Sequence, residues 1–294
     1  MSSLLSTIKS YFSLVRFSHT IFAMPFALIG FFLAISTDDY EFSFRLLLLI
    51  ILCMVFARNA AMGFNRLADK RFDSLNPRTS RREIPSGIIS TGAAVIFVIV
   101  NSALFITATA FINRLTLLLS PVALLIVLGY SLTKRITALC HFILGLGLSL
   151  APVGAYISVT GSFSILPVIY SVLVLTWVSG FDIIYALQDN EFDSTNKLFS
   201  IPSVTGIKNA LKISIIVHFI TFLAVICAGY LGNGHFLFWT GAAIFILLLI
   251  YQHTIVKPGD LSRINVAFGT TNGIASIIFA IFTILDLFLL KNKY

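Results

Sequence analysis

Two pairs of aspartates have the spacing that most clearly suggests chemistry. Asp69 and Asp73 follow a long apolar stretch and lie four residues apart, and Asp189 and Asp193 repeat that interval after another apolar stretch. On one continuous helix, residues four apart share a face, so each pair would bring two carboxylates together. Two such carboxylates repel each other unless a cation lies between them. Their oxygens suit Mg²⁺, which uses one or two carboxylates together with substrate phosphates and water.

Each pair belongs to a longer pattern. Asn65 lies four residues before Asp69, and Asp182 and Tyr185 lie seven and four residues before Asp189. A helix that continued through each motif would place these side chains on the same face as the aspartates. The second pair follows the first at a constant offset of 120 residues (69 to 189 and 73 to 193). The matched spacing suggests an old duplication in which two similar helical halves face each other.

Basic side chains accompany both acid pairs. Arginine is favoured where one group must make two hydrogen bonds to a phosphate. The basic residues near the motifs are Arg16, Arg78, Arg82, Lys134 and Arg135. Metal ions on the acids would neutralise charge on a departing diphosphate, and the basic groups would hold its oxygens. The two signs of charge together therefore indicate chemistry on a diphosphate ester.

The chain that must position these groups is strongly apolar. Of its 294 residues, 58% are hydrophobic and 11% are charged, whereas a soluble domain has about 25% charged residues. A membrane-spanning helix needs about 20 mostly apolar residues. The sequence predicts nine such spans, at residues 18–36, 44–66, 92–112, 115–131, 138–159, 164–185, 210–231, 235–256 and 266–290. Because several connections are short, we expect an all-α, multi-pass bundle that forms a single domain over residues 1–294.

The distribution of Lys and Arg predicts the orientation of this bundle. Cytoplasmic loops carry an excess of these residues, and most of the 20 in this chain fall on one side if the N-terminus is inside. Both acid pairs lie on that side. The formal net charge of +8 then describes a basic face beside anionic lipid headgroups. Without a soluble basic domain to carry it, this charge does not indicate nucleic-acid binding.

The motifs resemble those of the UbiA superfamily of intramembrane prenyltransferases. NRLADKRFD (residues 65–73) is similar to its N-R-x-x-D-x-x-x-D motif, and DIIYALQDNEFD (182–193) to its D-x-x-Y-x-x-x-D-x-x-x-D motif. NPRTSRREIPSG (76–87) and YSLTKRIT (130–137) are similar to two further signatures. Residues 16–34 and 137–157 look most like the 4-hydroxybenzoate polyprenyltransferase branch, including its relatives in menaquinone formation.

The resemblance implies an enzyme of quinone biosynthesis in a bacterial inner membrane, with its active site at the cytoplasmic face. It would transfer a polyprenyl chain from its diphosphate to an aromatic carboxylic acid, forming a carbon–carbon bond. The residues implied to bind Mg²⁺ and the diphosphate are Asn65, Asp69, Asp73, Asp189 and Asp193. Either Asp182 or Tyr185 would orient the acceptor or take its proton. The residues implied to bind substrate are Arg16, Asn65, Arg66, Arg78, Arg82, Tyr130, Lys134 and Arg135.

One loop departs from the family pattern. Relatives commonly have a basic residue and a glycine before S-I-P, whereas this chain reads STNKLFSIP over residues 194–202. Lys197 stands where the glycine is expected. Lys197 is therefore the candidate to supply a phosphate contact from this loop.

Several alternatives stay open at the level of sequence. The acceptor is 4-hydroxybenzoate, or a naphthoate-type or modified-chorismate acid of a menaquinone route, and neither the prenyl chain length nor the oligomeric state follows from the motifs. Tyr130 and Tyr185 fit either a site or an interfacial aromatic belt. The five histidines lack the i, i+4 spacing of a metal pair, which favours packing roles. A secondary transporter is a distant alternative, but it predicts functional groups near the bilayer midplane.

Overall fold

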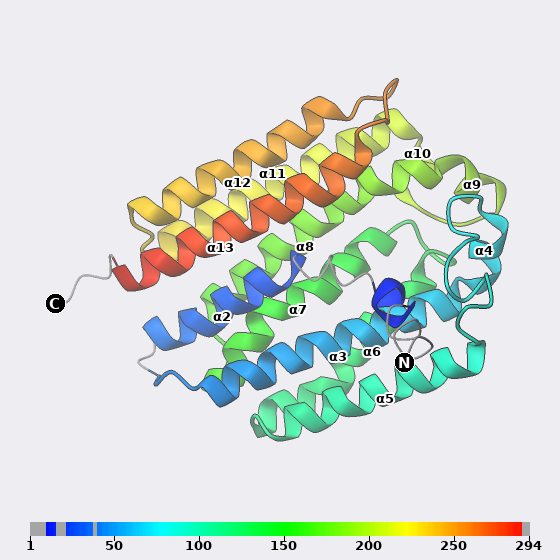
Figure 1. Ribbon diagram of the computed structural model, residues 1–294. Helices are drawn as coiled ribbons and strands as arrows, with labels where there is room; N and C mark the ends of the chain where they lie inside the picture. The colour runs from blue at the N-terminus through cyan, green and yellow to red at the C-terminus, as the bar shows by residue number, and fades with distance from the viewer. Residues whose placement is uncertain (1–9, 16–21, 38–39, 290–294) are drawn as a thin grey trace.

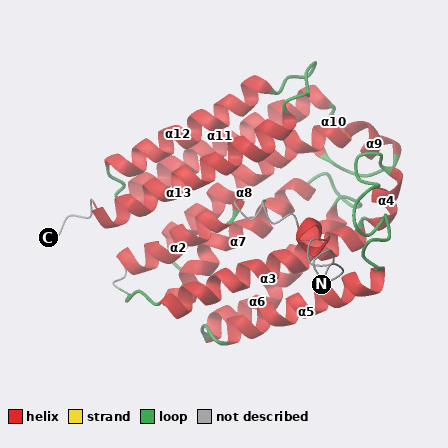
Figure 2. Ribbon diagram, in the orientation of Figure 1, coloured by secondary structure: helices red, strands yellow, loops and turns green. Residues whose placement is uncertain are grey.

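The computed structural model describes residues 10–15, 22–37 and 40–289. Nine long apolar helices dominate this part of the chain (Figures 1 and 2). They are α2 (Met24–Thr37), α3 (Phe44–Ala68), α5 (Thr91–Ala110), α6 (Arg114–Thr133), α7 (Cys140–Thr160), α8 (Ile165–Ala186), α11 (Ile207–Leu231), α12 (Phe236–Ile255) and α13 (Asn272–Leu289). Eight helices in the described ranges are long and apolar enough to cross a membrane, and α2 is a shorter apolar helix. The predicted all-α bundle of about nine helices is confirmed.

The boundaries differ from prediction at two spans. The first helix begins at Met24 instead of residue 18, and residues 16–21 lie outside the described ranges. The last predicted span is divided, because a π-helix, η3 (Val266–Thr271), precedes α13. The Asn272 amide donates to the carbonyls of Ala267 (2.8 Å) and Phe268 (3.2 Å) within this region. The wider π-turn is therefore held by a buried side chain.

The helices form two groups with two helices between them (Figure 1). Helix α3 packs on α5 and α6, and in the other group α8 packs on α11 and α12 on α13. Helix α7 contacts both groups through α6 and α8, and α2 packs on α7 and α13. This order brings α3 and α8, the helices that lead into the two acid motifs, into one bundle with their motif ends on the same side.

Close backbone contact holds the central helices together. In lipid there is little hydrophobic drive between helices, so small residues that allow close approach matter more than in water. A Cβ atom built on Gly30 would lie 2.0 Å from the carbonyl oxygen of Pro152, and one on Gly145 would lie 2.5 Å from that of Leu175. These two glycines therefore set the approach of α2 to α7 and of α7 to α8. Trp177, fully buried on α8, fills the core beside them.

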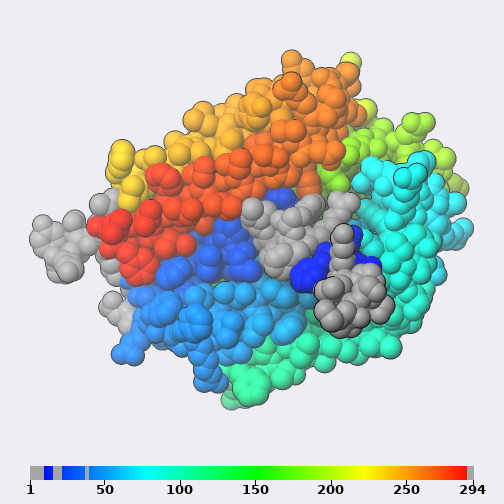
Figure 3. All heavy atoms as spheres, in the orientation of Figure 1, coloured from blue at the N-terminus to red at the C-terminus, as the bar shows by residue number. Residues whose placement is uncertain are grey.

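Short helices gather at one end of the bundle, which we call the motif end. They are α4 (Lys70–Leu75), the 3₁₀ turn η2 (Leu187–Asp189), α9 (Asn190–Thr195) and α10 (Ile201–Thr205). Figure 1 shows α4, α9 and α10 together there, and in Figure 3 the cyan atoms of the α4 region lie against yellow-green atoms of the later segment. The two motifs, far apart in sequence, are thus neighbours in space.

Neither motif lies on a single continuous α-helix, the condition under which its side chains would share one face. Helix α3 ends at Ala68 and α8 ends at Ala186, and a short helix follows each. The backbone of Asp69 has φ −87° and ψ 4°, and that of Asp189 has φ −103° and ψ 6°, so both leave the α-helical region. Hydrogen bonds of the i to i+4 type still bridge the first break, from Asp69 N to Asn65 O (2.9 Å) and from Asp73 N to Asp69 O (2.7 Å). The chain therefore bends at the first motif without losing its helical hydrogen bonds, and at the second motif it passes through the 3₁₀ turn η2.

Candidate active site

The two acid motifs have matching backbone positions as well as matching sequence spacing. Asp69 is the N-cap of the six-residue helix α4, and Asp189 is the N-cap of the six-residue helix α9. The second aspartate of each motif, Asp73 or Asp193, lies inside that short helix and is buried. The segments following the first aspartates also share the pattern F-D-S-x-N at residues 72–76 and 192–196. This local repeat is longer than the aspartate spacing alone suggests.

Each of the four aspartates is paired with a different basic side chain. The pairs are Asp69 with Arg135 (3.5 Å), Asp73 with Arg82 (2.7 Å), Asp189 with Arg78, and Asp193 with Lys134 (2.8 Å). Arg82 reaches both oxygens of its partner, and Arg78 makes a two-pronged contact that includes Nε to Oδ1 of Asp189 at 3.0 Å. The structure therefore brings together the eight acid and base groups that the sequence left in four separate segments.

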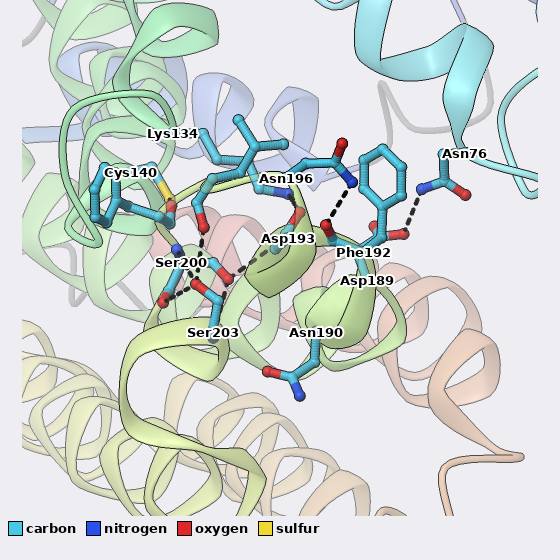
Figure 4. Close-up of polar contacts among 12 residues, drawn as sticks. Asn76, Lys134, Cys140, Asp189, Asn190, Phe192, Asp193, Asn196, Ser200 and Ser203 are labelled. Carbon is cyan, nitrogen blue, oxygen red and sulfur yellow. Dashed lines mark hydrogen bonds and ion pairs between the residues drawn. The ribbon is translucent and has the colours of Figure 1, made fainter.

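Most of these pairs join segments distant in sequence. Arg78 and Asn76, in the loop after α4, both reach Asp189, with the Asn76 amide 3.2 Å from Oδ1. Figure 4 shows Asn76 directed at Asp189, whereas Asn190 points away from the acid groups. Lys134, at the end of α6, reaches Asp193 from another direction. The site is thus assembled from both motifs and from the loop between α6 and α7.

The Lys134 ammonium is the central cation of this arrangement. Burial by itself would lower the pKa of Lys134, but attraction to Asp193 and Asp189 outweighs it and raises that pKa above its usual value. For Asp69, burial and then the charge of Asp73 raise the pKa of the carboxyl, and Arg135 and Lys134 offset part of that rise. One ammonium therefore interacts with acids of both motifs, which is the place where a metal ion bound between the motifs would act.

The aspartates differ in their access to a ligand. The Asp69 side chain is 30% exposed, that of Asp189 is 13% exposed, and that of Asp193 is only 1% exposed. Asp193 also accepts a hydrogen bond from the buried Ser200 hydroxyl at 3.0 Å (Figure 4). Asp69 and Asp189, the first members of the two pairs, are therefore the acids most open to a bound ion.

The donor set fits Mg²⁺, although the acids do not form a closed metal cage. Within the described ranges, no group of three or more His, Cys, Asp or Glu side chains is close enough to hold a metal ion. Magnesium, however, is usually held by one or two carboxylates, with waters and substrate phosphates completing its octahedron. Each of the four carboxylates is paired with a basic side chain, and Mg²⁺ bound in place of those side chains would leave them open to an anionic ligand. The donor set therefore fits Mg²⁺ whose coordination is completed by water or by an anionic ligand.

The other predicted residues are placed as follows. The Asn65 amide donates to Oδ2 of Asp69 at 3.1 Å, so Asn65 orients the first aspartate. Arg66 is 3% exposed at the end of α3, and Tyr130 lines an apolar cavity described below. Arg16 lies outside the described residues.

Asp182 and Tyr185, left as alternatives by the sequence, have different surroundings. The Tyr185 hydroxyl accepts a hydrogen bond from Arg78 at 3.4 Å, and its ring stacks on Phe268 with centroids 4.0 Å apart. The Asp182 carboxylate instead contacts Nδ1 of His141 at 2.6 Å. His141 is buried, as a packing role predicts, but it also makes this polar contact, which no local spacing reveals because the two residues are 41 positions apart.

Lys197 has a backbone conformation that favours glycine. It follows the C-cap Asn196 of α9 and has φ 55°, in the left-handed region. The Leu198 amide then donates to the Asp193 carbonyl at 2.9 Å, the hydrogen bond that closes a helix of this type. Among the described residues the exposed Lys197 makes no ion pair. The position thus serves helix termination, and a phosphate contact from Lys197 stays a prediction.

An apolar cavity of about 380 Å³ lies between α3, α6 and α7. Near the motif end it is lined by Arg58, Met62 and Tyr130, and toward the opposite end by Ser158 and Phe163. Met62 lies three residues before Asn65 and Tyr130 four residues before Lys134. The cavity therefore begins about one helical turn from the acid and base groups and continues into the apolar part of the bundle.

Comparison with known sequences gives a consistent result. The profile of the UbiA prenyltransferase family matches residues 23–282. A protein named 4-hydroxybenzoate octaprenyltransferase from Aliivibrio fischeri (strain MJ11) is 26% identical over 235 residues, covering 80% of this chain and 82% of its own length. The protein of the same name from Francisella tularensis subsp. mediasiatica (strain FSC147) is 27% identical with the same coverage.

Solved structures show the same fold. The apo structure of a UbiA homolog from Aeropyrum pernix K1 aligns with a TM-score of 0.83 and 32% identity, covering 91% of this chain and 98% of that one. A UbiA homolog from Archaeoglobus fulgidus bound to DMAPP and Mg²⁺ aligns with a TM-score of 0.76 and 22% identity, covering 95% and 99%. The helical arrangement of Figure 1 is therefore shared across these proteins.

Proposed function

Because the chain belongs to the UbiA prenyltransferase family, we propose that it transfers a polyprenyl group from polyprenyl diphosphate to an aromatic carboxylic acid. The observation that carries the proposal is the single assembly of four aspartates and four basic side chains next to an apolar cavity. The charged groups suit an ionic diphosphate, and the cavity suits an apolar chain. A substrate with both parts fits the two sites together.

The diphosphate would bind at the motif end. Asp69, Asp73, Asp189 and Asp193, with Asn65 orienting Asp69, would hold Mg²⁺. The basic residues that these acids now hold, Arg78, Arg82, Lys134 and Arg135, would then be free to contact diphosphate oxygens. When bound, Mg²⁺ neutralises negative charge on the departing diphosphate. Two similar Mg²⁺ sites, one for each motif, are consistent with the matching positions of Asp69 and Asp189.

The prenyl chain would occupy the cavity. Its wall on α7 extends from Leu144 to Ser158, a length of about 21 Å at a rise of roughly 1.5 Å per residue. Small residues, Gly147, Ala151 and Gly154, form part of this wall and leave room for the chain. Several isoprene units therefore fit along α7 with their reactive end toward the motif end.

The reaction would proceed by loss of diphosphate and attack by an aromatic ring. Breaking the bond between the allylic carbon and oxygen leaves the electron pair on diphosphate and a positive charge on the chain. The rings of Phe181 and Tyr185 both pack on Phe268, and aromatic faces stabilise such a cation more strongly where water is excluded. A ring carbon of the acceptor then forms the new bond. The relatives named 4-hydroxybenzoate octaprenyltransferase support 4-hydroxybenzoate as the acceptor, with naphthoate-type or modified-chorismate acids next.

We place this single enzyme domain in the bacterial inner membrane with the motif end facing the cytoplasm. The concentration of Lys and Arg near the motifs supports that orientation. The product would then be a prenylated precursor of a membrane quinone, retained in the bilayer by its chain.

The test is product formation by the purified protein in detergent with Mg²⁺, octaprenyl diphosphate and 4-hydroxybenzoate. Prenylated hydroxybenzoate that disappears with EDTA and returns with added Mg²⁺ supports the proposal. Product only with a naphthoate-type acid changes the acceptor and keeps the reaction. A folded protein that prenylates neither kind of acid refutes the proposed function, and transport assays in sealed vesicles then become the next measurement.

A further inference from the structure

His141 is a buried histidine that connects two parts of the site. It lies on the first turn of α7 and is 2% exposed. Its Nδ1 is 2.6 Å from Oδ2 of Asp182 on α8, and its Nε2 is 3.3 Å from the backbone nitrogen of Ile201 at the start of α10. The imidazole therefore has one partner at each ring nitrogen, in two other helices.

These partners assign the tautomer. A backbone N–H can only donate, so Nε2 of His141 must be the acceptor for Ile201. In the neutral ring the proton then lies on Nδ1, which donates to the Asp182 carboxylate. The ring cannot turn without losing both hydrogen bonds. One oxygen of Asp182 is held in place, and Oδ1 has no hydrogen bond from the described residues.

The neighbouring Tyr185 has different interaction partners. Its hydroxyl contacts Arg78, which also binds Asp189, and its ring is stacked against Phe268. Tyr185 thus belongs to the side of the site that we assign to diphosphate and allylic cation. Asp182 lies one helical turn earlier on α8, its side chain is 21% exposed, and its Oδ1 accepts no hydrogen bond from the described residues.

From these contacts we infer that His141 is the positioning residue that aims the carboxylate of Asp182, the acid that would take the proton lost by the acceptor ring. The inference rests on the proposed function. After the new carbon–carbon bond forms, the C–H bond at the same ring carbon breaks. Its proton goes to Oδ1 of Asp182, and its electron pair restores the aromatic ring. His141 keeps its Nδ1–H throughout and holds Oδ2 through that hydrogen bond.

A second role for His141 must be separated from the first. Ile201 follows Ser200, whose hydroxyl holds Asp193, so His141 also supports the start of α10. Two substitutions distinguish these roles because an Asn amide reaches about as far as Nδ1 and a Gln amide about as far as Nε2. His141→Asn can still donate to Asp182, and His141→Gln can still accept from Ile201.

The experiment compares His141→Asn, His141→Gln and Asp182→Asn with wild-type protein, using the aromatic acid that the wild type prenylates. General-base catalysis contributes about 10²- to 10⁴-fold, so Asp182→Asn should lower kcat by about that factor. His141→Gln should lower kcat by about tenfold or more, and His141→Asn should stay within about threefold of wild type. The KM for prenyl diphosphate should not change in any variant.

A ring-deuterated acceptor supplies a readout that a structural role does not move. If proton removal becomes slow, Asp182→Asn and His141→Gln should show a larger primary isotope effect on kcat than wild type, and His141→Asn should not. Equal losses in both His141 variants without an isotope effect, or wild-type rates in His141→Gln, would overturn the inference. Failure of wild-type protein to prenylate any aromatic acid refutes the proposed function itself, and with it the assignment to Asp182.

Discussion

Replacement of Asp189 by asparagine is the most direct perturbation of the proposed diphosphate site. Three donors meet this carboxylate, namely Nε and Nη2 of Arg78 and the Asn76 amide at 3.2 Å. Asparagine has the same size as aspartate but no charge. An N–H₂ group replaces one of the two carboxylate oxygens and would face a hydrogen-bond donor. The substitution therefore removes a Mg²⁺ ligand and leaves the position of the backbone unchanged.

The expected loss of activity is large, and the expected loss of stability is small. Removing one charged contact that acts in the transition state costs about 3–4 kcal/mol, or roughly 10²- to 10³-fold in kcat. The Arg78 and Asp189 side chains are partly exposed, at 33% and 13%, so loss of their ion pair should lower the free energy of unfolding by only about 1 kcal/mol. The two effects can therefore be separated.

The assay measures prenylated product at saturating substrate over a Mg²⁺ titration, with thermal unfolding in detergent as the folding check. Asp260→Asn is the matched control, because Asp260 lies exposed in the loop after α12 and the carboxylate hydrogen-bonds only Ser262 among the described residues. We expect the control to keep wild-type activity within about twofold. An Asp189→Asn protein that retains more than about a tenth of the wild-type kcat would show that this carboxylate does not hold the metal or the diphosphate.

Three further predictions concern the cavity, a helix cap and the α9 loop. Gly154→Leu should lower kcat/KM for long prenyl diphosphates more than for geranyl diphosphate, since its side chain would enter the cavity wall; equal losses for both donors would contradict this. Asp286 accepts hydrogen bonds from the backbone amides of His235 (2.9 Å) and Phe238 (3.0 Å) at the start of α12. Asp286→Ala should therefore lower the free energy of unfolding in detergent by about 1–3 kcal/mol, and Asp286→Asn should lower it by less. Lys197→Gly should stabilise by roughly 0.5–1 kcal/mol by relieving a positive φ, and Lys197→Ala, which keeps the Cβ atom, should not.

The acid pairs and the nine apolar segments could be recognised from the sequence because each depends only on residues close together in the chain. Residues four apart interact on a helix whatever surrounds it, and about 20 apolar residues are sufficient to cross a bilayer. The bends at Asp69 and Asp189 could not be read from that spacing, since the hydrogen-bond pattern continues through the first of them. The repeated F-D-S-x-N pattern at residues 72–76 and 192–196 was the available signal that a separate short helix follows each first aspartate.

Asn76 and His141 show what sequence reasoning missed. Asn76 lies in the repeated pattern and its amide contacts Asp189, 113 residues away, so the repeat could have drawn attention to it. His141 had no comparable signal. It precedes an apolar run and has no acidic residue near it in sequence, and only the packing of α7 on α8, made close by Gly145, brings it to Asp182.

By itself, the sequence determined that the protein spans a lipid bilayer, that it is helical, and that acidic and basic side chains form the site. Hydropathy, segment length and residue chemistry are local properties of the chain. The tertiary structure decided which acid meets which base, which aspartates are open to a ligand, and which of Asp182 and Tyr185 keeps a free oxygen. Those outcomes depend on contacts between helices far apart in the chain, and the close approach of small residues at their interfaces sets those contacts. The eight charged groups could be identified from the sequence, but they form one site only because α3, α6 and α8 end on the same side of one bundle.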